Sequence, residues 1–452
     1  MKKLELPNVT LLGIDCINVE RLQAAMDASQ QDIEFGAVKL LTSLPTQDSR
    51  LVTIPHIDSI EDFSRFCIED LHEYVDTEYV LLVQYDGFVL SAARWNPEFL
   101  SHDYIGGPID TTTWKEWKSD IPKPQYFVGN GGFCLRSKKF LEISAKLVNE
   151  GKIKNMHPED IALCVWYKDL LEKEGLTFAP VELAMKFSVQ SDYGEYEKPF
   201  GFHGLYGENL DTLNEEHPEF PMQNFMPRIR KARLEKSKKV FEPVAIEGHY
   251  FGSMARGDAD MWSDIDVWFT FKDESMAETL EKRFEYYAQV GEIIHICEPP
   301  QNAPINGVQS SVIYKTRVGL LAVDYSLCPQ STSYVIIGSK SLFGEIELPV
   351  GEIGYNPNKV IVSQSYRIDF FVSIIFGSIK KILRREENPL AFLMSEYQKL
   401  KDLYQIAVEP LSNIEHSLAT LREVIENIRK VANDKQNIAL TEILTFIKKL
   451  DK

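Results

Sequence analysis

The sequence lacks a cysteine pattern, a long apolar run and an excess of positive charge, and each absence argues against a class of protein. Its six cysteines form no CxxC pair and no Cys/His ligand spacing, which argues against a zinc site or a disulfide framework. Because no run of about 18 apolar residues occurs, we expect no transmembrane segment and a soluble, cytoplasmic protein. The net charge of -18 argues against nucleic acid as a main partner, because phosphate backbones are bound through Lys and Arg.

The chain is long and apolar enough to build several cores. Its 452 residues are 44% hydrophobic and 11% aromatic, which predicts a folded protein of two to three domains. Three prolines among Asn and Glu residues, Pro218, Pro221 and Pro227, mark the main boundary. We therefore expect domains at 1–222, 223–355 and 356–452. No feature of the sequence selects an oligomeric state.

The first part of the chain alternates strand and helix patterns. The expected strands are Val9–Ile14, Phe35–Leu41 and Glu78–Val83, and the expected helices are Val19–Ser29 and one that Ser59 caps and that runs to about Val75. This alternation predicts an α/β domain with a mostly parallel sheet, whose ligands bind at the carboxyl ends of the strands.

Four segments of this part carry groups suited to a metal and a nucleotide. They are Gln84-Tyr85-Asp86-Gly87, the glycine-rich 128–133, His157-Pro-Glu-Asp160 and Phe200-Gly-Phe-His203. Each also has an ordinary reading: an Asp-Gly turn, a tight turn, a helix start with favourable acidic residues, and a core histidine.

In this order the four segments resemble the hallmarks of GT-A-fold glycosyltransferases, and most closely an uncharacterised bacterial GT-A-like family, over roughly residues 6–210. The resemblance implies a GT-A-like (Rossmann-type) fold and metal-dependent glycosyl transfer from a nucleotide sugar. It assigns Asp86 and His203 to Mn²⁺ or Mg²⁺, Asp160 to the catalytic base, and Gly131 and Gly132 to a loop near the acceptor and donor sugar.

Gln84 departs from that pattern, which has a carboxylate at this position. A neutral amide lowers the negative charge available to a cation. A sugar-binding module that has lost activity is therefore an open alternative for this domain.

The second part contains the most informative stretch, Gly252–Trp268. A Gly252-Ser253 turn opens a short helix, and Asp264 and Asp266 follow on one face of an expected strand, because strand side chains repeat every two residues. Two such carboxylates repel each other unless a divalent cation lies between them, and N–H groups at a helix start bind anions. The stretch predicts a site for a metal-bound polyphosphate.

Asp324 is a candidate third ligand. It lies in the apolar run Leu320–Leu327, where a lone carboxylate is costly unless it is paired or bound to a metal. Together with Val312–Thr316 this run predicts a hairpin, and a strand beside Asp264 and Asp266 would complete an acidic triad. An ordinary strand-edge aspartate is the alternative.

These residues resemble the pattern of the polymerase-β-like minimal nucleotidyltransferase superfamily, which includes antibiotic nucleotidyltransferases, over about residues 225–400. The resemblance implies an α+β domain that transfers a nucleoside monophosphate from NTP to an acceptor hydroxyl with Mg²⁺. It makes Asp264, Asp266 and Asp324 metal ligands, with Asp324 also able to take the acceptor proton. Gly252, Ser253 and Arg256 would hold the phosphates.

The end of the chain reads as a C-terminal helical bundle. Apolar residues recur at helical spacing in Ile361–Leu383, Leu390–Ile406, Ile414–Val431 and Ile438–Leu450. In the antibiotic-modifying relatives such helices cover the nucleotide, so Lys380 is a candidate to reach the triphosphate, with a surface lysine as the alternative. The basic run at 228–239 is interpreted as a solvated helix without site residues.

Three functional hypotheses follow. The first is a bifunctional transferase that uses a nucleotide sugar and an NTP as substrates and a sugar or small-molecule acceptor. In the second, only the nucleotidyltransferase is active and modifies an antibiotic or a protein hydroxyl. The third, an inactive scaffold, is the weakest, because idle clustered carboxylates are costly.

Overall fold

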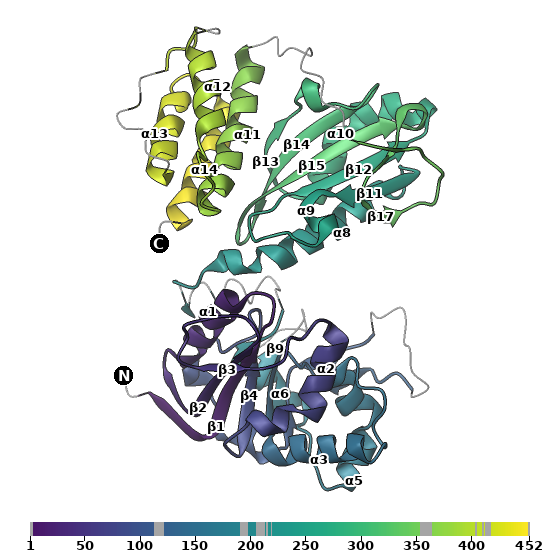
Figure 1. The fold of residues 1–452 in the computed structure, drawn as a ribbon, viewed down its shortest axis with the longest axis vertical. Helices are drawn as coiled ribbons and strands as arrows, with labels where there is room; N and C mark the ends of the chain where they lie inside the picture. Colours follow the sequence, from purple (N-terminus) through teal and green to yellow (C-terminus); the bar gives the residue numbers. More distant parts are fainter. Residues whose placement is uncertain are drawn as a thin grey trace. The chain divides into compact units, whose positions relative to one another are not determined.

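The computed structural model describes residues 3–112, 122–189, 198–204, 213, 216–217, 219–352, 364–402, 405–408, 411 and 417–450. The chain folds as two compact units, Met1–Pro221 and Met222–Lys452 (Figure 1). Across the described residues, no helix has the length and apolar character needed to cross a membrane.

The first unit is built on a six-stranded sheet in the order β3-β2-β1-β4-β8-β5. The strands β3, β2, β1 and β4 run parallel, whereas β8 and β5 are antiparallel to their neighbours, so the predicted mostly parallel sheet is confirmed. The bounds of these strands are β1 Leu4–Ile14, β2 Ile33–Thr42, β3 Leu51–Thr53, β4 Tyr79–Val83, β5 Tyr104–Ile105 and β8 Phe133–Ser137. Short strand pairs join β6 Pro108–Asp110 to β7 Tyr126–Val128 and β9 Ser188–Val189 to β10 Gly201–Phe202.

Helices pack around this sheet, and their limits follow local sequence signals. They are α1 Val19–Gln30, α2 Ile60–Glu69, α3 Lys138–Asn149, α4 Glu159–Ile161, α5 Lys168–Lys173 and α6 Val181–Phe187. Ser59 caps α2 by accepting a hydrogen bond from Asp62 N, as predicted. The predicted extension of α2 to Val75 is wrong, because the α-helix stops at Glu69 and a 3₁₀ turn follows at Leu71–Tyr74. Acidic residues at this C-terminus oppose the helix dipole, which favours an early end.

The second unit begins with α8 Met226–Phe241 and a six-stranded sheet in the order β13-β14-β15-β12-β11-β17. Its neighbours are antiparallel except for β12 and β15, which run parallel. The bounds are β11 Glu247–Phe251, β12 Ile265–Phe271, β13 Ile293–Cys297, β14 Val308–Thr316, β15 Gly319–Pro329 and β17 Lys340–Phe343, with α9 Gly252–Arg256, α10 Met276–Val290 and a small pair β16 Val335–Ile336 and β18 Val350–Gly351. The predicted β14–β15 hairpin is confirmed.

In the described residues after 363 the helices are α11 Gln364–Leu383, α12 Ala391–Asp402, α13 Leu418–Arg429 and α14 Asp434–Leu450. Figure 1 shows them as a bundle beside β13. Their apolar faces share one core with Ile294, Ile313 and Leu320 of the sheet. The predicted succession of an α/β part, an α+β part and a helical bundle is confirmed, whereas the exact domain limits stay a prediction.

Candidate active site

The site of the second unit starts where β11 turns into α9. Phe251 at the end of β11 pairs with Asp266 of β12, so the next residue, Gly252, lies against the Asp266 carboxylate. Gly252 has a φ of 68°, and a Cβ added to it would lie 2.2 Å from Asp266 Oδ2. Both the backbone conformation and the lack of space require glycine at this position.

The register of the parallel strands brings two acidic residues together. Asp266 of β12 lies opposite Asp324 of β15, although the two are far apart in the sequence. The Asp324 Oδ1 atom is buried and has no hydrogen-bond partner among the described residues. A buried carboxylate oxygen without a partner is costly, and a cation or a proton would relieve that cost.

The charges of this pair are not balanced by the chain itself. Burial raises the pKa of Asp266 to about 8, and the neighbouring Asp324 and Asp264 carboxylates add to the shift. Burial and Asp264 also raise the pKa of Asp324 to about 6. The site therefore favours a bound positive charge near these two residues.

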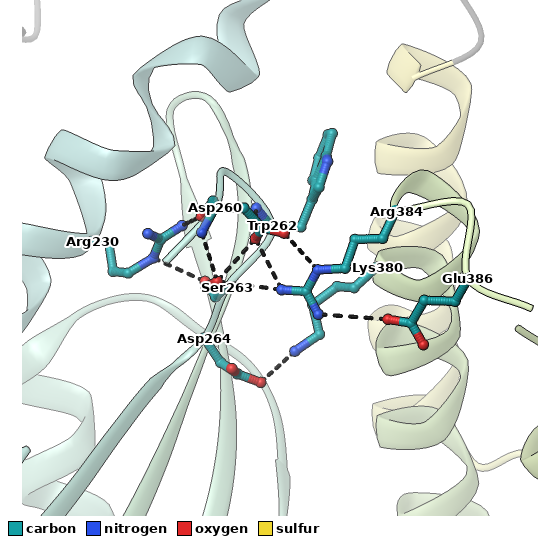
Figure 2. A network of polar contacts seen from close by, with 8 residues as sticks. All are labelled: Arg230, Asp260, Trp262, Ser263, Asp264, Lys380, Arg384 and Glu386. Atoms are coloured by element: carbon teal, nitrogen blue, oxygen red, sulfur yellow. Dashed lines mark hydrogen bonds and ion pairs between the residues drawn. The ribbon is translucent and has the colours of Figure 1, made fainter. Parts of the chain in front are cut away.

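Asp264 is already paired with a cation of the chain. Lys380 Nζ on α11 donates to Asp264 Oδ2 (Figure 2). Burial pushes the pKa of Asp264 upward, but the charge and hydrogen bond of Lys380 outweigh it, so this pKa lies below its ordinary value. The lysine predicted to reach a triphosphate thus contacts one of the predicted metal ligands.

The other predicted phosphate-binding residues lie around α9. Ser253 is half-buried, and its carbonyl accepts hydrogen bonds from Gly257 N and Asp258 N, which closes the short helix. Arg256 Nε donates to Asp258 Oδ2 at 3.1 Å on the surface. The roles of Ser253 and Arg256 toward phosphate stay predictions.

The structure adds residues that the sequence did not single out. Arg230, Asp260, Ser263 and Arg384 form a polar network beside Asp264 (Figure 2). Arg230 lies in the run 228–239 that the sequence predicted to be a solvated helix. That prediction is wrong for Arg230, which is only 2% exposed. A signal was present, because the buried positions of α8 recur at helical spacing and include Arg230: Met226, Arg230, Leu234, Ser237 and Phe241.

The donor set of this site fits a divalent cation at Asp266 and Asp324. Carboxylate oxygens are the ligands that Mg²⁺ prefers, and the orphaned Asp324 Oδ1 supplies one. Among the described residues, no group of three or more His, Cys, Asp and Glu side chains is already arranged around a metal position. Asp264 lies near the other two carboxylates, and one of its two oxygens, Oδ2, accepts from Lys380.

In the first unit, the Asp86 and His203 segments come together beyond the end of β4. Gln84 and Gly87 exchange backbone hydrogen bonds of 2.8 and 3.1 Å, so Asp86 lies in a tight turn. Its carbonyl accepts from Gly204 N at 2.9 Å, and His203 Nε2 lies 3.9 Å from Asp86 Oδ2. Asp86 has no exposed surface.

The glycine-rich loop joins both remaining segments to this point. A Cβ added to Gly132 would lie 2.2 Å from His203 Nε2, and one added to Gly131 would lie 1.5 Å from Glu159 Oε1. Asp160 accepts hydrogen bonds from Asn130 N at 3.2 Å and Ile161 N at 2.9 Å. All four predicted segments are therefore neighbours, and Asp160, the candidate base, holds the loop through Asn130.

Arg136 and Glu159 form a buried ion pair that the sequence analysis missed. Arg136 is completely buried in β8, and its Nη2 lies 3.3 Å from Glu159 Oε1. Burial and the neighbouring Asp160 raise the pKa of Glu159 to about 7, against the opposing effect of Arg136. A lone arginine in the buried strand Phe133–Ser137 was the available signal, because a buried charge needs a partner.

Comparison with known families divides the chain in the same way. Residues 48–203 match a family described as a protein of unknown function (DUF5672), and residues 227–304 match the nucleotidyltransferase domain. A comparison with curated proteins found no match.

Similar solved structures have low identity and low TM-scores. A glycosyltransferase involved in glycosylation of the major capsid of PBCV-1 is 11% identical, with 46% of this chain and 98% of that chain covered and a TM-score of 0.29. An active-site mutant of LgtC is 13% identical, with 44% and 88% covered and a TM-score of 0.26. The STING-associated CdnE c-di-GMP synthase from Capnocytophaga granulosa is 16% identical, with 54% and 87% covered and a TM-score of 0.18.

The family matches complete the description of the two parts. The sequence pattern around Gly252, Asp264 and Asp266 lies inside the matched range 227–304, and Asp324 is joined to it by strand pairing. The second unit of this chain contains a nucleotidyltransferase domain, and the first contains a region of the DUF5672 family.

Proposed function

We propose that the second unit transfers a nucleoside monophosphate from a Mg²⁺-bound NTP to an acceptor hydroxyl, with pyrophosphate as the leaving group. The observation that carries this proposal is the pairing of Asp266 with Asp324, with Gly252 against Asp266, in a nucleotidyltransferase domain. Such a transfer depends on positioning and charge neutralisation more than on covalent help. Two half-buried carboxylates beside a glycine turn suit that requirement.

Each residue of the site has a role in this proposal. Asp266 and Asp324 would hold Mg²⁺, which when bound neutralises charge on the triphosphate and the leaving pyrophosphate. Asp324, which lies opposite Asp266 on the neighbouring strand, would accept the proton of the acceptor hydroxyl. Lys380 would release Asp264 and turn its charge to the triphosphate, and Ser253 would donate to a phosphate oxygen.

The test is nucleotide incorporation with pyrophosphate release. The protein is incubated with Mg²⁺, each NTP and a cell extract as the source of acceptor, and products are followed by mass spectrometry. We expect one acceptor to gain a nucleoside monophosphate while pyrophosphate appears, and Asp266→Asn to abolish both. Glu274→Gln is the control, since Glu274 is exposed and lies outside both the acidic set and the segment around α9 that precedes Asp264. Undiminished incorporation by Asp266→Asn would exclude the mechanism.

We propose as a second activity that the first unit binds a nucleotide sugar with Mn²⁺ or Mg²⁺ and transfers the sugar, which would make the chain bifunctional. The approach of His203 to Asp86, with Gly132 against the histidine, favours this activity. Asp160 is the candidate base, and Gly131 and Gly132 would border the sugar. The neutral Gln84 favours the alternative of a sugar-binding module without turnover.

Calorimetric titration tests the second proposal. UDP- and GDP-sugars are titrated into the protein with and without Mn²⁺. Metal-dependent binding that Asp86→Asn removes would support a sugar-nucleotide site, and sugar transfer to an acceptor would then separate an active enzyme from a binding module. A lack of binding by every nucleotide sugar would overturn it.

A further inference from the structure

We propose that Arg384, the residue that follows α11, acts through Asp260 as a positioning residue of the nucleotidyltransferase site: it fixes the loop 257–264 and thereby the Asp264 carboxylate that follows Ser263. This inference rests on the nucleotidyltransferase function proposed above. It goes beyond that function because Arg384 and Asp260 lie outside the acidic set, and within the described part of the chain they are bonded to the loop and not to Asp266 or Asp324.

Arg384 and Asp260 are joined by two hydrogen bonds. Arg384 Nε donates to Asp260 Oδ2 at 2.7 Å, and Arg384 Nη2 donates to Asp260 Oδ1 at 2.9 Å (Figure 2). Two parallel N–H···O bonds between a guanidinium and a carboxylate fix relative orientation as well as distance. Burial opposes ionisation of Asp260, but the bonds from Arg384 and Ser263 outweigh it and lower its pKa to about 2.

Asp260 also holds the loop together from within. Asp260 Oδ1 accepts from Trp262 N and from Ser263 Oγ, each at 2.9 Å, and Ser263 Oγ accepts from Asp260 N at 3.0 Å. These short-range bonds define the turn that leads into β12. Because Asp264 is the next residue after Ser263, the shape of this turn sets where its carboxylate begins.

The loop is held by two arginines, Arg230 and Arg384. Arg230 of α8 donates to the carbonyls of Asp260 and Ser263 at 2.6 and 2.9 Å. Arg230 is buried in the core of the unit, whereas the Arg384 side chain is 31% exposed. Loss of Arg384 should therefore loosen the loop without removing a core residue, which makes it the better residue to test.

Arg384 lies close in the chain to Lys380, the residue that bonds to Asp264. Lys380 is in the last turn of α11, and Arg384 follows the helix directly, with its backbone N–H donating to the Lys380 carbonyl at 3.0 Å, so the two side chains leave the chain one helical turn apart. Arg384 bonds to the loop at Asp260, and Lys380 bonds to Asp264 at its end (Figure 2). Arg384 thus holds the loop ahead of a predicted metal ligand, and its bond to Asp260 can persist when Lys380 leaves Asp264.

The experiment compares three variants of the full chain. Arg384→Gln removes the two parallel bonds, Arg384→Lys keeps the charge, and Arg385→Gln changes the exposed neighbouring arginine as a control. All three carry Asp86→Asn as well, so that the proposed metal ligand of the first unit does not contribute to Mn²⁺ binding. Mn²⁺ binding without nucleotide is measured by electron paramagnetic resonance, and exchange of loop amides by hydrogen–deuterium mass spectrometry. The Mg²⁺ concentration for half-maximal pyrophosphate release is measured by titration with NTP and the cell extract that supplies the acceptor.

For Arg384→Gln we expect about tenfold weaker Mn²⁺ binding, the size typical of losing a residue that orients a metal ligand, together with a similar rise in the half-maximal Mg²⁺ concentration. Amide exchange should quicken in 257–264 but not in β14 and β15. Arg384→Lys should restore part of both effects, and Arg385→Gln should match the chain that carries Asp86→Asn alone.

Two results would overturn the inference. Mn²⁺ affinity and Mg²⁺ dependence in Arg384→Gln equal to those of the chain with Asp86→Asn alone would show that the contact does not position the site. Faster exchange throughout the unit would show that Arg384 only supports the fold. Failure of the proposed function looks different, because the wild type itself would then release no pyrophosphate in the presence of Mg²⁺, NTP and the cell extract that supplies the acceptor, and this would overturn both proposals.

Discussion

Asp266 and Asp324 lie opposite each other on parallel strands, and both pKa values are raised above the ordinary range of a carboxyl. In the unfolded chain these groups ionise near pH 4. The folded, metal-free protein therefore binds more protons than the unfolded chain between about pH 4 and the raised pKa values. Stability from this source is fully present below about pH 4 and is lost as the pH rises toward 8.

This sign leads to a first prediction for Asp266→Asn. Without metal, the variant should be more stable than the wild type at pH 8, by on the order of 2 kcal/mol, because one of two facing charges is gone. The difference should shrink at pH 5. Thermal and denaturant unfolding at both pH values, with a chelator present, measure it.

Asp258→Asn serves as the control for that comparison, because Asp258 is exposed and should change stability little at either pH. Added Mg²⁺ should stabilise the wild type more than Asp266→Asn. Equal stabilisation of both by Mg²⁺ would contradict the assignment of Asp266 as a ligand.

Gly252 gives a second prediction at the residue scale. Gly252→Ala places a Cβ against the Asp266 carboxylate at a φ of 68°, so we expect about a hundredfold loss of transfer activity from displacement of that carboxylate. Gly257→Ala is the matched control, because its φ is 86° but an added Cβ meets nothing within 4 Å. It should cost about 1 kcal/mol of stability and keep activity. Equal activity losses in both would mean that backbone strain alone matters.

Local patterns allowed some site residues to be predicted, and long-range partners explain the rest. Asp264 and Asp266 share a strand face, and Gly252 opens a turn shortly before them. A short stretch of sequence is therefore enough to predict that these residues lie close together. Arg384 gains its role only from Asp260, which lies far away in the sequence. Nothing in the spacing around Arg384 distinguishes it from the exposed Arg385.

At the scale of elements, periodicity predicted most strands and helices but not their exact limits or register. The strand predicted from Val9 begins at Leu4, because a register shift between Leu6 and Thr10 accommodates Pro7. The adjacency of Asp324 to Asp264 and Asp266 is a hypothesis from the cost of a lone carboxylate in an apolar run, and the family resemblance agrees with it, but sequence alone does not specify which strand lies beside β12. The register of β12 and β15 supplies that information.

The shared core of sheet and bundle yields an element-scale prediction. Ile375 on α11 is completely buried in the cluster that includes Ile294 and Ile313 of the sheet. Ile375→Ala should cost about 3 kcal/mol and lower hydrogen-exchange protection in β13 and β14 as well as in α11. Ile438→Ala, at a position 63% exposed, should change stability by less than about 0.5 kcal/mol. Loss of protection confined to the helices would contradict a common core.

At the scale of the whole molecule, the chain carries two units with separate acidic sites. Asp86 and His203 belong to the first unit, and Asp266 and Asp324 to the second. The sequence predicted this division because Pro218, Pro221 and Pro227 separate the part with alternating strand and helix patterns from the part that carries Asp264 and Asp266. It did not predict that the C-terminal helices and the second sheet share a core, because that depends on packing between distant segments.

Separate sites predict separable losses. Asp86→Asn should remove metal-dependent binding of nucleotide sugars and leave pyrophosphate release from NTP within about twofold of the wild type, since the metal ligands of the second unit are intact. Asp266→Asn should do the reverse. Calorimetry and a pyrophosphate assay on both variants measure this, and loss of both activities in either variant would contradict independent sites.

The most direct measurement of the central claim is the stoichiometry of pyrophosphate released to nucleoside monophosphate incorporated, with the wild type and Asp266→Asn side by side. A nucleotidyltransferase built on Asp266 and Asp324 should release one pyrophosphate for each nucleotide that an acceptor gains, in a Mg²⁺-dependent reaction that Asp266→Asn abolishes. Transfer that persists in Asp266→Asn, or NTP consumption that yields phosphate without any nucleotide gain, would contradict it.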